Sequence, residues 1–302
     1  MGSLPTTTSA SDLTTNPVTD PRIIELAAPI RRAYPEDRVF DSIMAVRGEV
    51  YRNHKNRRTI RVEIEGKRYF IKSHGHSGWM EIFKNTLRLR LPVLTAAPEW
   101  LGIQRLNELG VPTMRCAGYA CRGRNPARME SFIITESLDD YLTLEDLIPI
   151  WAKLGDSQRK NLTRRAIREI AILARKLHTN GLNHRDFYLC HFMTRARDWN
   201  KWKGDDEMVL HLIDLHRMQM RARTPLRWLI KDLSGLLFSV LDLDLTLRDY
   251  LRFLKGYWGE NWKHTFRRTK WLRRFIVHRA VNLYRRKQGK PPPVPADLAS
   301  FS

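Results

Sequence analysis

The sequence predicts an α+β fold with two lobes, a small strand-rich lobe followed by a larger and mainly helical one. Residues 60–65 alternate between apolar and charged side chains, which is the period of a half-buried strand. Residues 157–178 instead repeat their apolar side chains at helical spacing. The chain has 302 residues and is 42% hydrophobic, so it can bury a sizeable core in one large or two small domains.

The first lobe is predicted from a hairpin, a helix and a further strand. Residues 60–64 and 68–72 form the hairpin strands, with a turn at Gly66-Lys67. A helix is expected from Pro98 to Leu109, because Gly110 follows its last apolar residue. Residues 131–135 (SFIIT) are expected to form a strand.

The second lobe is predicted to centre on the helix over residues 157–178, which Gly181 ends. Short strands are expected at 192–193 and 209–213, and helices from there to about residue 287. The expected organisation is a disordered tail (1–22), the small lobe (23–136), the larger lobe with a basic C-terminal helix (137–287) and a Pro-rich tail (288–302).

The charge predicts anionic partners. Lys and Arg number 53 against 32 Asp and Glu, a formal net charge of +21. Nucleic acid is one such partner, but the chain has no helix-turn-helix or zinc-finger pattern. Its three cysteines are too few for a disulfide framework, which favours a reducing compartment. Neither a signal peptide nor a membrane-spanning run is expected.

Four chemistry-bearing residues occur in the order of a kinase-fold phosphotransferase. Lys72 ends a strand, Glu99 lies on a helix, Asp186 closes a His-Arg-Asp loop and Asp214 follows an apolar strand. Each has an ordinary structural interpretation when taken alone, such as a solvated lysine or a carboxylate at a helix start. Together and in this order, they indicate a lysine that binds phosphate and is held by a glutamate, one aspartate that accepts a proton, and a second aspartate that binds magnesium. Asp232, at the start of a later helix, is expected to anchor the catalytic loop and not to react.

Four departures from the protein-kinase pattern narrow the choice of acceptor. The segment after Gly48 has no glycine-rich loop, and His191 occupies the place of the asparagine that binds a second metal. Asp214-Leu215-His216 replaces Asp-Phe-Gly, and the stretch from there to Trp228 is short. Such a chain has little surface on which a peptide acceptor could bind, which favours a small or extended non-peptide acceptor.

These features together resemble the Kdo/WaaP family of lipopolysaccharide inner-core sugar kinases. The similarity runs from Gly48 to about Trp258. It is carried by RRTIRVEIEGKRYFIKSHGHSGWMEIFKN, PEWLGIQRLNELGVPT, GLNHRDFYLCHF, IDLHR and KDLSGLLFS. The resemblance implies a protein-kinase-like fold and ATP-dependent phosphorylation of heptose I of the inner core, at the cytoplasmic face of a Gram-negative inner membrane. Kdo as the acceptor sugar, or a pseudokinase scaffold of lipopolysaccharide assembly, are the alternatives.

The resemblance also implies roles for individual residues, with ATP and Mg²⁺ as cofactors. Asp186 becomes the catalytic base, Lys72 and Glu99 the pair that holds the ATP phosphates, and Asp214 a magnesium ligand. His191 either joins Asp214 at the metal or positions Asp186, since imidazole is a poorer ligand for Mg²⁺ than oxygen.

The basic residues are expected to hold the anionic lipopolysaccharide core. Arg217, Arg221 and Arg223 follow the magnesium strand and are candidates for binding the acceptor. Residues 263–290 contain eleven Lys and Arg and no Asp or Glu, in the pattern of a basic amphipathic helix. That helix suits an anionic membrane surface, or simply packs with a solvated basic face. A surface this basic is also compatible with a small acidic protein partner such as acyl carrier protein.

Overall fold

The computed structural model describes residues 24–34, 38–54, 56–80, 83, 94–196 and 208–293. The expected N-terminal tail and the last nine residues of the expected Pro-rich tail lie outside the described residues. The chain divides into two compact units. The first comprises residues up to Leu101 together with Arg115–Ser137, and the second comprises Gly102–Met114 together with the chain from Leu138 onward.

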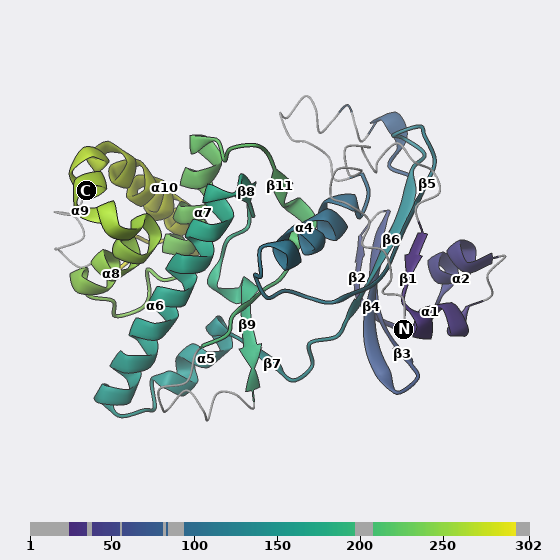
Figure 1. Cartoon of the computed structure of the whole chain (residues 1–302), viewed down its shortest axis with the longest axis horizontal. Helices are drawn as coiled ribbons and strands as arrows, with labels where there is room; N and C mark the ends of the chain where they lie inside the picture. Colours follow the sequence, from purple (N-terminus) through teal and green to yellow (C-terminus); the bar gives the residue numbers. More distant parts are fainter. Residues whose placement is uncertain are drawn as a thin grey trace, which may run out of the picture. The chain divides into compact units, whose positions relative to one another are not determined.

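The first unit is built on a six-stranded antiparallel sheet (Figure 1). The predicted hairpin is confirmed, with its turn one residue earlier than expected, at Glu65-Gly66. Both turn residues have positive φ, +50° and +72°, as a two-residue hairpin turn between right-twisted strands requires. The strands, in sheet order, are β1 (Ile24–Leu26), β5 (Cys116–Arg122), β6 (Glu130–Glu136), β4 (Lys67–His74), β3 (Arg57–Ile64) and β2 (Glu49–His54).

The two faces of this sheet differ in what they carry. Helices α1 (Ala28–Ala33) and α2 (Val39–Ala45) pack on one face, in a core that includes Ile71 of β4. Because side chains alternate along a strand, the next residue, Lys72, belongs to the opposite face. The alternation that buries Ile71 therefore also sets the direction of the predicted phosphate-binding lysine.

Helix α4 (Ala97–Glu108) confirms the helix predicted over residues 98–109. Its first turn belongs to the first unit, where Trp100 stacks on Tyr119 of β5 with ring centres 4.6 Å apart. Gly110, at φ +61°, follows the helix end.

The second unit is mainly helical. The predicted central helix is confirmed as α6 (Asp156–Thr179), and the apolar residues of its predicted stripe, Leu162, Ala166, Ile170, Leu173, Ala174 and Leu177, are all buried. The other helices are α5 (Leu144–Trp151), α7 (Leu226–Phe238), α8 (Leu247–Trp258), α9 (Trp262–Arg268) and α10 (Lys270–Gln288). Helix α8 packs against α6, and α10 packs against α7 (Figure 1).

The single basic helix predicted over residues 263–290 is wrong in one respect, because two helices occupy that segment. Helix α9 ends and α10 begins on either side of Thr269, which has φ −108° and ψ +27°. The Thr269 hydroxyl donates a hydrogen bond to the carbonyl of Thr265, 2.7 Å away. Such a bond from threonine to the preceding turn competes with regular helix geometry and bends the chain.

Two small antiparallel sheets hold the loops that carry the predicted site. Strand β8 (Leu182–Asn183) pairs with β11 (Gln219–Met220), and β9 (Phe192–Arg195) pairs with β10 (His211–Leu212) and β7 (Tyr141–Thr143). The predicted strand at 192–193 is therefore confirmed, and the one at 209–213 is shortened to two residues. The loop between β8 and β9 carries Asp186, and the loop between β10 and β11 carries Asp214, so pairing at both ends fixes these loops together.

Gly181 shows how tightly one of these loops is held. It has φ +75°, and a Cβ atom there would lie 1.7 Å from the carbonyl oxygen of Arg221. We expect Gly181→Ala to lower the free energy of unfolding by about 3 kcal/mol or more, because the clash with backbone adds to the strain of positive φ.

Gly289 provides the matched control in urea unfolding. It has φ +69° at the end of α10, but no atom lies within 4 Å of the position that a Cβ atom would take. Gly289→Ala should cost about 1 kcal/mol. Equal losses for the two variants would contradict the close approach at Gly181.

Candidate active site

The loop that carries Asp186 is anchored by a buried carboxylate. Asp232, fully buried on α7, accepts hydrogen bonds from the backbone N–H groups of His184 and Arg185 at 2.6 and 2.7 Å. The backbone of Arg185 has φ +73°, a conformation that non-glycine residues rarely adopt. These two charge-assisted hydrogen bonds hold the strained loop in place.

Asp232 is itself supported from two other helices. Nε2 of His178, on α6, lies 3.5 Å from the carboxylate, and its Nδ1 lies 2.7 Å from the hydroxyl of Tyr257 on α8. His178 is buried, so α6, α7 and α8 meet around one polar network. A buried network of this kind is specific to one arrangement of its helices.

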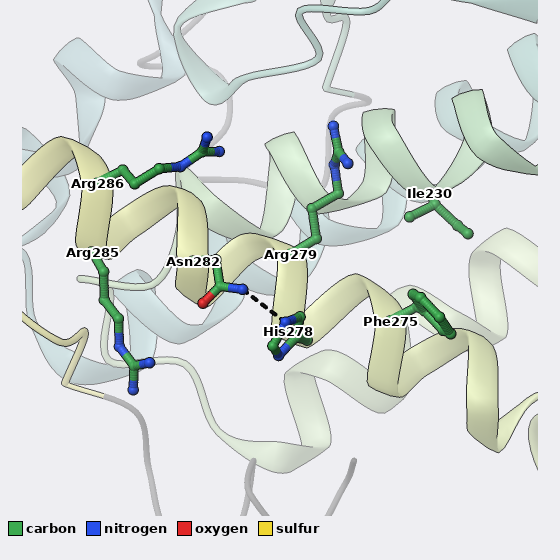
Figure 2. Close-up of a pocket in the computed structure, with 7 residues that line it drawn as sticks. All are labelled: Ile230, Phe275, His278, Arg279, Asn282, Arg285 and Arg286. Atoms are coloured by element: carbon green, nitrogen blue, oxygen red, sulfur yellow. Dashed lines mark hydrogen bonds between the residues drawn. The ribbon is translucent and has the colours of Figure 1, made fainter.

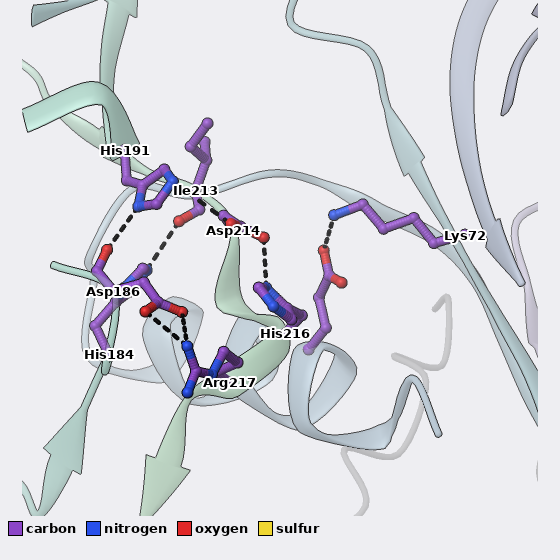
Figure 3. Close-up of polar contacts among 9 residues, drawn as sticks. Lys72, His184, Asp186, His191, Ile213, Asp214, His216 and Arg217 are labelled. Carbon is purple, nitrogen blue, oxygen red and sulfur yellow. Dashed lines mark hydrogen bonds and ion pairs between the residues drawn. The ribbon is translucent and has the colours of Figure 1, made fainter. Parts of the chain in front are cut away.

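The carboxylate of Asp186 is paired with a single arginine. Nη1 of Arg217 lies 2.9 and 3.0 Å from its two oxygens (Figure 3). The Asp186 side chain is 14% exposed, so it is accessible yet partly shielded from water. A carboxylate in this position can accept a proton from a bound hydroxyl group while Arg217 fixes its orientation.

Two histidines connect the Asp186 loop to the Asp214 loop. Nε2 of His184 lies 2.9 Å from the carbonyl oxygen of Ile213, and burial lowers the pKa of this ring, so it stays neutral there. Nδ1 of His191 lies 2.6 Å from the carbonyl oxygen of Asp186 (Figure 3). Since a carbonyl can only accept, both of these ring nitrogens carry protons and donate.

The second ring nitrogen of His191 faces Asp214. With Nδ1 protonated, Nε2 has a lone pair in the neutral ring, and it lies 3.5 Å from Oδ2 of Asp214. The other oxygen, Oδ1, accepts a hydrogen bond of 2.6 Å from Nδ1 of His216. Asp214 has φ +61°, so the backbone turns sharply at this carboxylate.

This donor set fits a magnesium ion that also takes ligands from a nucleotide. In the described part of the chain no three His, Cys, Asp or Glu side chains are grouped closely enough to hold a metal by themselves. Mg²⁺ in phosphotransferases is usually held by one or two carboxylates together with substrate phosphates and water. Asp214 supplies one such carboxylate, and Nε2 of His191 lies 3.5 Å from its Oδ2.

The first unit carries the predicted lysine–glutamate pair. Nζ of Lys72, on β4, lies 2.6 Å from Oε1 of Glu99 on α4 (Figure 3). The Glu99 side chain is only 1% exposed and its Oε2 has no hydrogen-bond partner within the described residues, whereas the lysine is 24% exposed. A buried carboxylate of this kind holds the lysine in one orientation, while part of the lysine side chain stays accessible to solvent.

The three arginines expected to bind the acceptor have different surroundings. Arg217 pairs with Asp186, and Arg221 donates a 2.9 Å hydrogen bond to Oδ1 of Asn183. Arg223 is exposed. The structure thus places only one of the three directly beside the predicted base.

Cys190 lies on the loop between β8 and β9 that also carries Asp186. Burial raises the pKa of its thiol to about 11, so the thiol stays protonated at neutral pH. A protonated thiol is a poor nucleophile, which agrees with a packing role.

Sequence reasoning did not assign His184, His216 or Tyr257 to the site. The first two stand next to assigned residues, in the strings His-Arg-Asp and Asp-Leu-His, which is a usable signal. Tyr257 offers no such signal, because it lies 79 residues from His178 in sequence.

Comparison with known proteins agrees with this geometry. The profile of the Lipopolysaccharide kinase (Kdo/WaaP) family matches residues 41–257. A Pseudomonas aeruginosa PAO1 protein named Lipopolysaccharide core heptose(I) kinase WaaP is 41% identical over 263 residues, which are 87% of this chain and 96% of that protein. An Escherichia coli K12 protein of the same name is 43% identical over 237 residues, 78% of this chain and 88% of that protein.

A solved structure is similar over nearly its whole length. The structure entitled "WaaP in complex with acyl carrier protein" has a TM-score of 0.70 and 35% identity, and the match covers 87% of this chain and 99% of that one. The expected α+β, kinase-like fold is thereby confirmed. The chain belongs to the lipopolysaccharide kinase (Kdo/WaaP) family.

Proposed function

We propose that this protein is an ATP-dependent kinase that phosphorylates heptose I of the lipopolysaccharide inner core. The observation that carries the proposal is the anchored pair of loops, which presents Asp186 and Asp214 with their histidine and arginine partners. Its sugar specificity is supported by relatives named as heptose(I) kinases, at 41–43% identity over most of this chain.

In the proposed reaction the heptose hydroxyl oxygen attacks the γ-phosphorus of ATP, and the bond to the β-phosphate oxygen breaks to release ADP. Asp186 accepts the hydroxyl proton, and Arg217 keeps both carboxylate oxygens in position. Lys72, oriented by Glu99, binds the nucleotide phosphates. Asp214 and His191 would hold Mg²⁺, which when bound neutralises the phosphate charge.

Arg217, Arg221 and Arg223 are proposed to bind the acceptor, whose core carries carboxylates and phosphates. A guanidinium group matches either anion with two parallel hydrogen bonds. Arg217 is the strongest of the three candidates, because it already touches the proposed base.

The experiment is phosphate transfer from labelled ATP to purified acceptors. A core that contains unphosphorylated heptose should be labelled, whereas a Kdo-only core, free sugars and a generic protein should not. Asp186→Asn should reduce turnover by a factor of about 10³ or more while leaving nucleotide binding nearly unchanged, because only the proton acceptor is lost.

Three results would contradict the proposal or a part of it. Labelling of the Kdo-only core would instead indicate a Kdo kinase. Nucleotide binding without transfer to any acceptor would favour a scaffold of lipopolysaccharide assembly, and near-normal turnover by Asp186→Asn would remove Asp186 as the base.

A small acidic protein, acyl carrier protein, is proposed as a partner. The similar solved structure is a complex with that protein. On this chain the α10 surface suits an acidic partner, because Arg279, Arg285 and Arg286 line a hollow of about 590 Å³ together with Ile230 and Phe275 (Figure 2). Phe275 is 60% exposed, so the surface offers an apolar contact among its cations.

The same basic surface is proposed to meet the anionic inner leaflet, at the cytoplasmic face of the inner membrane. None of the described helices is long and apolar enough to span a bilayer. Attachment would therefore depend on surface charge, with exposed Trp271 and Phe275 as apolar contacts.

Charge reversal on α10 tests both partners. Arg279→Glu with Arg286→Glu should weaken binding to acyl carrier protein at least tenfold and abolish co-sedimentation with anionic vesicles, since attraction becomes repulsion. Arg164→Glu, on an exposed position of α6, is the control and should change little. Binding that is unaffected by the α10 reversal, or by added salt, would contradict an electrostatic surface there.

A further inference from the structure

A single tryptophan at the start of α7 is surrounded by three cationic side chains. The guanidinium carbons of Arg185 and Arg227 lie 4.9 and 5.2 Å from the ring centre of Trp228, and Nζ of Lys231 lies 5.7 Å from it. Arg185 comes from the anchored loop, and the other two flank Trp228 on α7. Three like charges are thus gathered around one ring.

These charges have no ion-pair partner among the described residues, although Asp186 and Asp232 are near enough to raise the pKa values of Arg185 and Lys231. The side chains of Arg185, Arg227 and Lys231 make neither an ion pair nor a hydrogen bond within that part of the chain. Two donors at the centre, Nε of Arg185 and Nε1 of Trp228, are buried and have no acceptor there. Buried donors are normally satisfied, so such a group indicates that something else supplies the acceptor.

The cations also act on one another. Burial and the nearby Arg217 charge lower the pKa of Lys231 to about 8, and the same two causes lower the pKa of Arg185. Both side chains therefore lie where positive charge accumulates and water is partly excluded. An anion bound among them would remove the repulsion and satisfy the buried donors.

The position of this cluster indicates which molecule carries the anionic group. Arg185 directly precedes Asp186 in the anchored loop, and Asp186 and Asp232 are the carboxylates that raise the pKa values of Arg185 and Lys231, so the cluster lies near the proposed base. The sugar acceptor must reach Asp186 with its reacting hydroxyl. An acidic group elsewhere on the same acceptor can then extend to the tryptophan.

We propose that Arg185, Lys231 and Trp228 form a binding site for an acidic group of the acceptor, a carboxylate or a phosphate, next to the base. This inference rests on the proposed sugar-kinase function and adds to it a recognition site that Arg217, Arg221 and Arg223 do not provide. The site makes the reaction selective for an anionic acceptor, because a neutral one leaves the cations and both buried donors without partners.

The test combines an altered protein with altered acceptors. Lys231→Gln removes one charge with little change of shape, and Lys255→Gln, at an exposed position of α8, is the matched control. Two acceptor arms distinguish the sources of the anion. In one the Kdo carboxylates are reduced to alcohols, and in the other the lipid A phosphates are removed.

We expect Lys231→Gln to lower kcat/KM for the intact acceptor roughly tenfold, the usual weight of one charge-assisted contact, with KM for ATP unchanged. The wild-type protein should show a similar loss with one of the two altered acceptors. With that acceptor Lys231→Gln should cause little further loss, because both changes remove the same contact. Arg185→Lys should lower kcat/KM for the intact acceptor to a value between those of the wild-type protein and Lys231→Gln.

Other outcomes overturn the site. Equal losses for Lys231→Gln with all three acceptors, no loss at all, or a raised KM for ATP would each exclude acceptor recognition at Trp228. If the wild-type protein transfers phosphate to none of them, the proposed function fails instead. Binding of the intact and altered glycolipids, measured without ATP for both proteins, then decides whether the anion site exists.

Discussion

The buried carboxylate of Asp232 is the interaction on which the rest of this site depends. It holds the backbone N–H groups of two successive residues, His184 and Arg185, and so supports a positive φ at the second of them. A residue keeps such a strained backbone conformation only where several surrounding contacts hold it in place. Here His178 and Tyr257 complete the support from α6 and α8. Stability of the helical unit and geometry of the reactive loop are therefore linked through one side chain.

The anchored loop also fixes the positions of the Asp186 and Asp214 carboxylates. His184 reaches the carbonyl of Ile213, directly before Asp214, and His191 lies between the Asp186 carbonyl and the Asp214 carboxylate. The two loops also end in paired strands, β8 with β11 and β9 with β10. Asp186, the proposed proton acceptor, and Asp214, the proposed metal ligand, are consequently fixed as one assembly. A displacement of the anchored loop would therefore be transmitted to Asp214.

Much of this could be predicted from sequence, for physical reasons that differ by element. The α6 stripe and the β3–β4 hairpin follow from local periodicity, and Lys72 with Glu99 from the order of elements in a known family. The pairing of Arg217 with Asp186 and the three cations around Trp228 could not be predicted, because they depend on how α7 and two loops meet. The break at Thr269 was missed since charge and apolar spacing continue across it, while a single hydroxyl bonds to the preceding turn.

The most direct measurement is amide hydrogen exchange in the loop of the Asp232→Asn variant. The substitution keeps the side-chain shape, but an amide presents only one oxygen to the two N–H groups that a carboxylate holds. We predict that exchange at His184 and Arg185 becomes at least tenfold faster, and that phosphate transfer falls with it, while α6 and β3 keep their protection. Exchange at these two amides as slow as in the wild-type protein, together with undiminished transfer, would contradict the claim that Asp232 holds the site together.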